Sequence, residues 1–236
     1  MKVFNYLLAL VLLSSACTAQ QINSTLGSVL NGGLSTTDVA SGLKEALRLG
    51  ATQGAQELSQ DGGYFDDLAY RILLPEEVQT VTSRLQGVPG FSDLEASILR
   101  KINQGAEDAA KSAGPIFVEA ITSMTIEDAW NILKGGDNAA TQYLQGATQI
   151  ALTEAFRPTI NESLDKFNAN QIWLDASTAY NRIPLLEPVE TDLTSYVTGR
   201  ALDGLFKKVA LKEQDIRSNI NARTSDLLRR VFAEQD

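Results

Sequence analysis

Four charged residues interrupt apolar helical patterns near the C-terminus of this 236-residue chain: Asp203, Arg217, Arg223 and Asp226. In a structural interpretation, one of the aspartates pairs with one of the arginines and fixes how the last two helices pack, and Asp226 also lies near a helix start, where negative charge is favourable. In a binding interpretation, the two arginines form an anion site for a phosphate or carboxylate head group. The sequence leaves both interpretations open.

Thr141 and Tyr143 raise the same question in the middle of a predicted helix. We expect Tyr143 to lie against the core with its hydroxyl bonded internally, and Thr141 to donate to a backbone carbonyl one turn earlier. Alternatively, both side chains are part of the polar lining of a ligand pocket. Together with the four charged residues they make up the candidate polar cluster.

The chain contains no histidine and a single cysteine, Cys17. Ser-His-Asp and Cys-His catalysis and histidine-based metal sites are therefore excluded. Adjacent carboxylates such as Glu127 and Asp128 point about 100° apart on a helix and do not converge. We predict no catalytic residue, no metal site and no cofactor, and we regard an enzyme that uses carboxylates or tyrosines as the least favoured class.

Cys17 ends a segment with the layout of a secretory signal, in which Lys2 precedes the apolar run Val3–Leu13 and the small residues Ser14–Ala16. The apolar run has about 11 residues, too few to cross a bilayer as a helix. The stretch before Cys17 resembles the bacterial lipobox, in which the cysteine is acylated and becomes the new N-terminus. Ordinary signal-peptide cleavage after Ala19 is the alternative.

The domain organisation predicted from this segment is a signal peptide over residues 1–16, a flexible tether over 17–33 and one helical domain over 34–236. We expect a bacterial protein that is exported to the periplasm or anchored to the outer membrane as a lipoprotein, with the membrane as partner through its acyl chains. The formal net charge of −9 argues against general nucleic-acid binding.

Apolar residues recur with helical spacing along nearly the whole domain, and no convincing strand alternation occurs. We therefore predict an all-α fold: a single compact bundle of eight to nine helices, mostly antiparallel, with kinks at Pro115 and Pro158. The predicted helices span residues 37–58, 75–86, 92–122, 125–134, 137–156, 158–168, 169–180, 190–217 and 222–234. Glycines at intervals of four in the first helix predict close approach of a neighbouring helix; a surface that admits a ligand is the alternative.

Two ordered motifs resemble family 4197 of the domains of unknown function (DUF4197). The first runs from Met124 to Ala129 and continues through Ile132-Leu133, Gly135 and Ala139–Tyr143. The second runs from Ala201 to Phe206 and continues through Ile216-Arg217, Ala222–Leu228 and Val231-Phe232. The departures are small: Arg71–Pro75 lacks one proline of the family pattern, and Ser225 replaces a threonine. The resemblance implies a helical, exported bacterial protein with no established activity.

Three functional hypotheses follow. The first is a membrane-tethered helical protein of the cell envelope that holds an apolar or amphipathic ligand, or an envelope protein partner, between its helices; it predicts a pocket with aliphatic walls and one or two charged groups at its mouth. The second is a scaffold without a ligand, with a filled core and an exposed apolar patch. The third is a carboxylate- or tyrosine-dependent enzyme.

Overall fold

The structure is a computed structural model that describes residues 34–74, 79, 94–166, 168–182, 184–185, 187–188 and 191–233. The predicted signal peptide and tether lie outside these residues, as does nearly all of the helix predicted over 75–86. Within them the chain forms helices and no strand, which confirms the all-α fold class. The helices are α2 (Thr36–Leu58), α4 (Leu94–Ala110), α5 (Ala113–Ser123), α6 (Ile126–Lys134), α7 (Ala139–Asp165), α8 (Ala169–Tyr180), α9 (Leu193–Ser218), the 3₁₀ turn η1 (Ile220–Ala222) and α10 (Asp226–Phe232).

Local sequence explains where several of these helices begin. Thr125 accepts a hydrogen bond from the backbone N–H of Asp128 (3.1 Å), and the Asp128 carboxylate accepts one from the backbone N–H of Thr125 (3.0 Å). Thr125 and Asp128 have capping-box spacing in the sequence, and the reciprocal box that they form satisfies two backbone donors at the start of α6. Ser35 and Asp38 form the same motif at the start of α2. Ser92 and Glu95 have the same spacing at the start of α4, but Ser92 lies outside the described residues.

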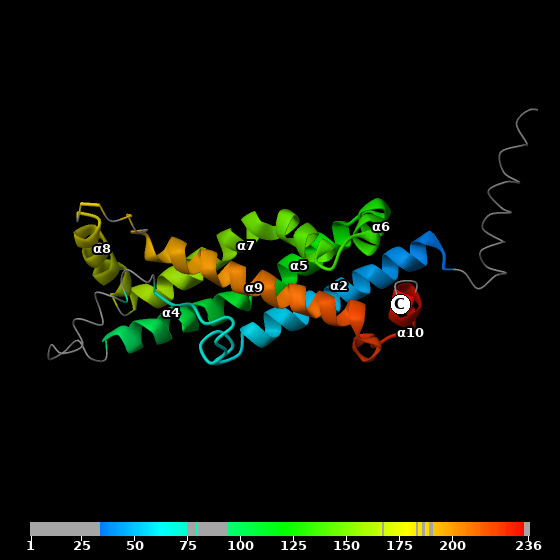
Figure 1. Cartoon of the computed structure of the whole chain (residues 1–236), viewed down its shortest axis with the longest axis horizontal. Coiled ribbons are helices and arrows are strands. Elements are labelled where there is room, and N and C mark those ends of the chain that lie inside the picture. Colours follow the sequence, from blue (N-terminus) through cyan, green and yellow to red (C-terminus); the bar gives the residue numbers. More distant parts are fainter. Residues whose placement is uncertain are drawn as a thin grey trace, which may run out of the picture.

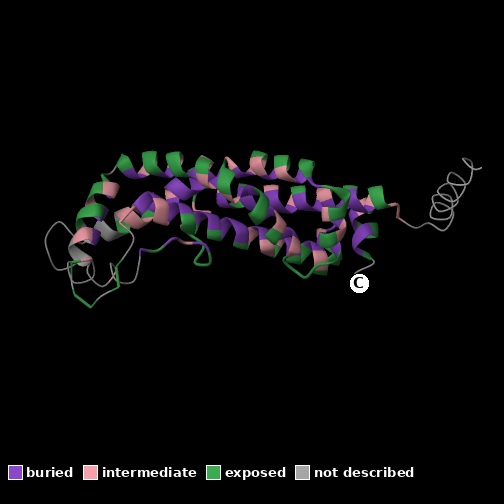
Figure 2. Cartoon of the chain, turned by 90° about the horizontal axis from the view of Figure 1, so that it is seen from above, coloured by how far each residue is buried: buried purple, intermediate pink, exposed green. Residues whose placement is uncertain are grey.

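The bundle is elongated: α4 packs along α7, α7 along α9 and α9 along α2, whereas α4 and α2 lie in opposite halves of the bundle (Figure 1). α9 runs antiparallel to both α2 and α7, whereas α8 lies at one end of the bundle and α10 at the other. One hydrophobic core extends along the inner faces, while exposed residues line the outer faces (Figure 2). No helix among the described residues is both long enough and apolar enough to cross a membrane.

The glycines of α2 lie where neighbouring helices approach most closely. A Cβ atom added to Gly42 would lie 2.7 Å from Cγ2 of Val231 in α10, and one added to Gly50 would lie 3.4 Å from Cδ1 of Ile216 in α9. The distance at Gly42 leaves no room for a side chain unless Val231 shifts, whereas the distance at Gly50 is an ordinary van der Waals contact. The glycine pattern therefore serves helix packing, as one of the two interpretations of the sequence predicted.

The prolines behave differently from the prediction. The helix expected over 92–122 breaks at Lys111 and Ser112, and Pro115 lies in the first turn of α5, where its missing N–H leaves no helical hydrogen bond unmade. Pro158 lies inside α7, which is one helix and not the two predicted over 137–156 and 158–168. The predicted kinks are not confirmed. The predicted number of eight to nine helices also stays a prediction, because part of it rests on residues 75–86.

Candidate functional site

A buried carboxylate, Glu213 of α9, lies at the first turn of α7. Its oxygens accept hydrogen bonds from the backbone N–H groups of Ala140 (3.0 Å) and Thr141 (2.8 Å), and from the Thr141 hydroxyl (2.8 Å). The first N–H groups of a helix have no partner within that helix, and they favour an anion. Glu213 supplies this anion from a different helix and thereby caps α7.

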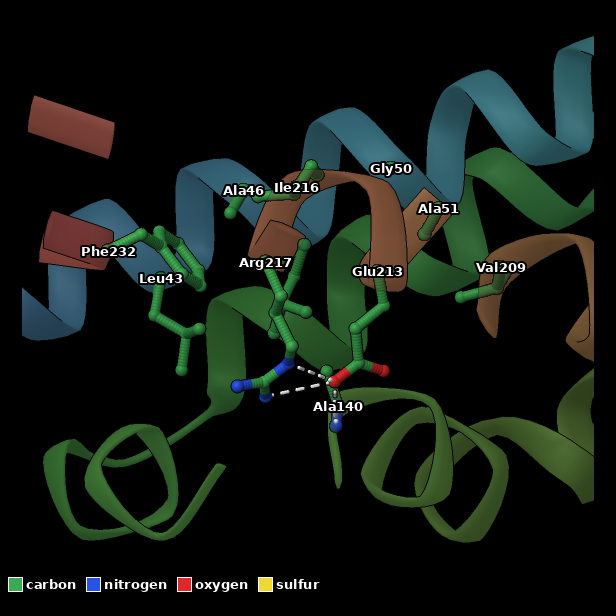
Figure 3. Close-up of a pocket in the computed structure, with 11 residues that line it drawn as sticks. Leu43, Ala46, Gly50, Ala51, Ala140, Val209, Glu213, Ile216, Arg217 and Phe232 are labelled. Atoms are coloured by element: carbon green, nitrogen blue, oxygen red, sulfur yellow. Dashed lines mark hydrogen bonds and ion pairs between the residues drawn. The ribbon is translucent and has the colours of Figure 1, made fainter. Parts of the chain in front are cut away.

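Arg217 follows Glu213 by one turn and completes the arrangement. Its Nε and Nη2 each lie 3.0 Å from Glu213 Oε1. Nη2 also donates to the carbonyl of Ile132 (2.9 Å) in the last turn of α6. Figure 3 shows both side chains reaching from α9 towards α6 and α7. We call Thr141, Glu213 and Arg217 the Glu213 clasp, because they join the end of α6 and the start of α7 to α9.

Arg223 is the largest fully buried side chain among the described residues. Its Nε donates to the carbonyl of Ile216 (3.0 Å) and its Nη2 to that of Arg217 (2.9 Å), and its guanidinium carbon lies 5.7 Å from the centroid of the Phe232 ring. The last carbonyls of a helix lack partners and favour a cation. Arg223 therefore caps the end of α9 and packs against α10.

The two aspartates of the predicted cluster lie elsewhere. Asp203 is exposed and lies 3.4 Å from Arg200, and Asp226 is exposed and lies 2.7 Å from Arg229. Each partner is three residues away on the same helix. The predicted pairing of these aspartates with the arginines of the cluster is therefore wrong, because local partners on the helix surface take their place.

Thr141 and Tyr143 lie in different surroundings, although both belong to the predicted cluster. The Thr141 hydroxyl donates to Glu213 and not to a carbonyl one turn earlier. Tyr143 is half-buried against the core, and burial, with a smaller contribution from Asp128, raises the pKa of its hydroxyl. The structure thus brings Thr141, Arg217 and Arg223 together around the end of α9, and leaves Tyr143 apart from them.

A small apolar cavity adjoins the Glu213 clasp between α2 and α9 (Figure 3). Leu43, Ala46 and Val209 contribute to its walls, and its volume is about 20 Å³. This is room for about one water molecule, whereas small-molecule pockets occupy roughly 300–1,000 Å³. Beside Glu213 and Arg217 the protein interior is therefore nearly filled and offers no ligand pocket.

A larger pocket of about 410 Å³ lies at the surface beside the irregular segment that follows α2, residues 59–74. We call it the Phe65 pocket; it is lined by Phe65, Arg71, Leu73, Ala96, Leu99 and Arg100. The guanidinium carbons of Arg71 and Arg100 lie 4.8 and 4.6 Å from the centroid of the Phe65 ring. Within the part of the chain that the structure describes, neither guanidinium has a carboxylate within ion-pair distance.

One face of α4 fixes the segment that carries Phe65 and Arg71. The side-chain amide of Asn103 accepts from the backbone N–H of Ile72 (2.8 Å) and donates to its carbonyl (2.9 Å). One turn later, the buried carboxylate of Glu107 accepts from the backbone N–H groups of Tyr64 and Phe65, each at 3.1 Å. The backbone of the pocket wall is thus held by side chains that are themselves buried.

Sequence reasoning missed both Glu213 and the Phe65 pocket. Glu213 precedes Arg217 by four residues, a spacing that places the two side chains on one helix face and that could have been noticed. Phe65 and Arg71 lie in a segment without periodicity, and Arg100 comes from a helix 29 positions further along the chain than Arg71. No pattern in the sequence predicts that these three side chains meet.

A model of the family described as "Protein of unknown function (DUF4197)" matches residues 33–233. The chain belongs to this family. The match confirms the resemblance seen in the two sequence motifs, and it covers every element named above. Searches of curated proteins and of solved structures found no match to this DUF4197 protein.

Proposed function

We propose that this DUF4197 protein is an exported lipoprotein of the bacterial envelope, tethered through Cys17, that binds an amphipathic anion in the Phe65 pocket. The observation that carries the proposal is the position of Arg71 and Arg100 over one aromatic ring, without a carboxylate partner among the described residues. The chain has an excess of nine acidic over basic side chains, so partners for surface cations are abundant. Two cations that lack such partners beside apolar walls suit a negatively charged ligand.

The chemistry of the walls supports an amphipathic rather than a fully polar anion. A guanidinium can donate two parallel hydrogen bonds to a carboxylate or phosphate oxygen pair. Leu73 and Leu99 offer apolar surface next to these donors, and each methylene buried there contributes about 0.8 kcal/mol. The volume of about 410 Å³ lies within the range of small-ligand pockets. The ligand lies at the surface in this proposal and not between the helices.

The scaffold alternative keeps one supporting observation, which is the filled interior beside the Glu213 clasp. A scaffold needs no ligand in the Phe65 pocket. The enzyme alternative finds less support, since no group of three or more candidate metal-ligating side chains occurs in the described ranges, and the most buried carboxylates, Glu107 and Glu213, are bonded to backbone N–H groups. The test must therefore separate a binding protein from a scaffold.

The test uses bacterial membranes that contain the full chain and a photoactivatable palmitic acid analogue with a diazirine and an alkyne. We expect the acid to label the protein at the Phe65 pocket, and the corresponding uncharged alcohol to label it weakly. Arg100→Gln should lower the labelling by the acid about tenfold, because it removes a charge-assisted contact. Arg48→Gln, which removes an exposed arginine of α2, is the matched control and should leave labelling unchanged.

Equal labelling of the wild type and of Arg100→Gln, or labelling outside the pocket, would contradict the binding proposal and favour the scaffold. The tether is tested in the same cells by metabolic incorporation of an alkyne fatty acid. Incorporation should be present in the wild type and absent in Cys17→Ser. A wild-type protein without acyl label would exclude the tether and leave the binding test unaffected.

A further inference from the structure

A second hollow lies on the other side of residues 69–74, between this segment and α9. We call it the α9 groove; its volume is about 570 Å³, and Tyr70, Arg71, Tyr196, Arg200 and Lys207 contribute to its lining. The Tyr196 hydroxyl donates to the carbonyl of Leu73 (2.8 Å) and so joins α9 to the segment. The groove is therefore built by the same short stretch of chain that forms one wall of the Phe65 pocket.

The lining of the α9 groove carries an excess of positive charge. Arg200, Asp203 and Lys207 follow each other at intervals of three and four residues, which places them on one face of α9. Arg200 and Asp203 are 3.4 Å apart and both exposed, so their attraction is weak. Lys207 donates to the carbonyl of Ala69 (3.2 Å) and lies 5.8 Å from the centroid of the Tyr70 ring. With Arg71 included, three cations face one carboxylate.

Arg71 and Leu73 line both hollows. The two hollows thus adjoin the same short segment, and an extended molecule that reaches past these residues would contact both. Each hollow offers cations and an aromatic ring: Phe65 on one side, Tyr70 and Tyr196 on the other. A ligand with one negative group for each hollow would suit this arrangement of cations.

We infer that the ligand of this protein is a dianionic amphiphile, with one negative group at Arg71 and Arg100 and the second at Arg200 and Lys207 of the α9 groove. This inference rests on the proposed function, because it needs the Phe65 pocket to be a binding site. It adds the second charge and the residues that recognise it. A ligand with two tethered groups binds more tightly than one with a single group, since the second contact is intramolecular.

The protein contains a reporter for the α9 groove. The ring of Trp173 in α8 stacks on Tyr196, with the centroids 6.0 Å apart and the planes inclined by 20°. The chain's only other tryptophan, Trp130, belongs to α6. The substitution Trp130→Phe therefore leaves Trp173 as the single tryptophan, and its neighbour Tyr196 lines the groove. Occupation of the groove should change its emission.

The experiment uses the full chain with Trp130→Phe in phosphatidylcholine nanodiscs, with empty nanodiscs as blank. Two probes are titrated by calorimetry and by fluorescence: dodecyl phosphate and dodecane-1,12-diyl bisphosphate. We expect the bisphosphate to bind at least about tenfold more tightly and to be the only probe that changes Trp173 emission. Arg200→Gln/Lys207→Gln should abolish this preference and leave the monophosphate affinity within about twofold.

The matched control is Arg48→Gln/Lys166→Gln, which removes one exposed arginine and one exposed lysine elsewhere and should keep the preference. Equal affinities of the two probes, without a change in Trp173 emission, would overturn the inference and leave the proposed function standing. Failure of both probes to bind would overturn both. A preference that survives the double substitution in α9 would place the second negative group elsewhere and would also overturn the inference.

Discussion

The Glu213 clasp and the Phe65 pocket both contain charged side chains, but their charges are satisfied in opposite ways. In the clasp, Glu213 receives two backbone N–H groups, a hydroxyl and a guanidinium, and all of these donors belong to the protein. In the pocket, Arg71 and Arg100 are paired with an aromatic ring and with no carboxylate of the described residues. The first arrangement is complete without a ligand, whereas the second leaves hydrogen-bond donors for one.

This difference shows why a charge embedded in an apolar pattern is a poor guide to function. Removal of a charge from water is so unfavourable that a buried charge is normally surrounded by partners from the protein. Such a group has few hydrogen bonds left to offer a ligand. Charges that bind are better sought where the cation reaches the surface of a hollow and lacks a protein anion. The arginines of the predicted cluster belong to the first kind, and Arg100, which has no carboxylate partner among the described residues, belongs to the second.

Substitutions in the Glu213 clasp should lower the stability of the protein more than substitutions in the Phe65 pocket. We expect Glu213→Gln to lower the free energy of unfolding by about 3–5 kcal/mol, because it removes one charge of the buried Glu213–Arg217 ion pair. Denaturation of the full chain in urea measures the effect. The double variant Glu213→Leu/Arg217→Met should be less destabilised than Glu213→Gln, because both charges are then absent. A loss below about 1 kcal/mol in Glu213→Gln would show that this ion pair contributes no more to stability than a solvent-exposed pair does.

Asn103 shares a property with each region: like the clasp it is buried, and it also holds the backbone that forms the wall of the Phe65 pocket. Asn103→Ala should lower the free energy of unfolding by about 1–3 kcal/mol, since it leaves the N–H and carbonyl of Ile72 unpaired. It should also reduce photolabelling at the Phe65 pocket, because Arg71 is the residue before Ile72 and its position depends on the same stretch of backbone. Gln142→Ala, an exposed amide of α7, is the control and should change neither quantity. Reduced stability with unchanged labelling would separate the α4 contacts from the site.

Asp128 represents a third kind of charge, exposed but bonded locally, and its effect should be the smallest. Hydrogen bonds from the Thr125 hydroxyl and backbone hold the pKa of Asp128 below its usual value of 3.8. A carboxyl with a lowered pKa contributes stability above its unfolded pKa and loses it as the pH falls through the folded pKa. The midpoint difference between the wild type and Asp128→Asn should therefore be constant between about pH 5 and 8 and shrink below about pH 4. A difference that persists at about pH 2 would contradict this account.

The sequence predicted what depends on short stretches of chain. The span of α2, the capping box at Thr125 and the packing role of Gly42 and Gly50 all follow from local spacing, and all are present. The site could not be predicted in this way, because the N-terminus of α7 and the side chain of Glu213 are joined only by the tertiary fold. The same holds for Arg100 and Phe65. The kinks predicted at the prolines are not confirmed: Pro115 lies in the first turn of a helix, which accommodates it, and α7 continues through Pro158.

The length of α2 separates the N-terminal end of the described chain from the candidate binding sites. Its 23 residues extend about 35 Å, from Ser35 at one end of the bundle to the segment that carries the Phe65 pocket (Figure 1). In the proposed lipoprotein the tether joins the bundle at the Ser35 end of this helix, and the segment that carries both hollows follows its other end. The point of attachment and the candidate binding sites are therefore separated by the full length of one helix.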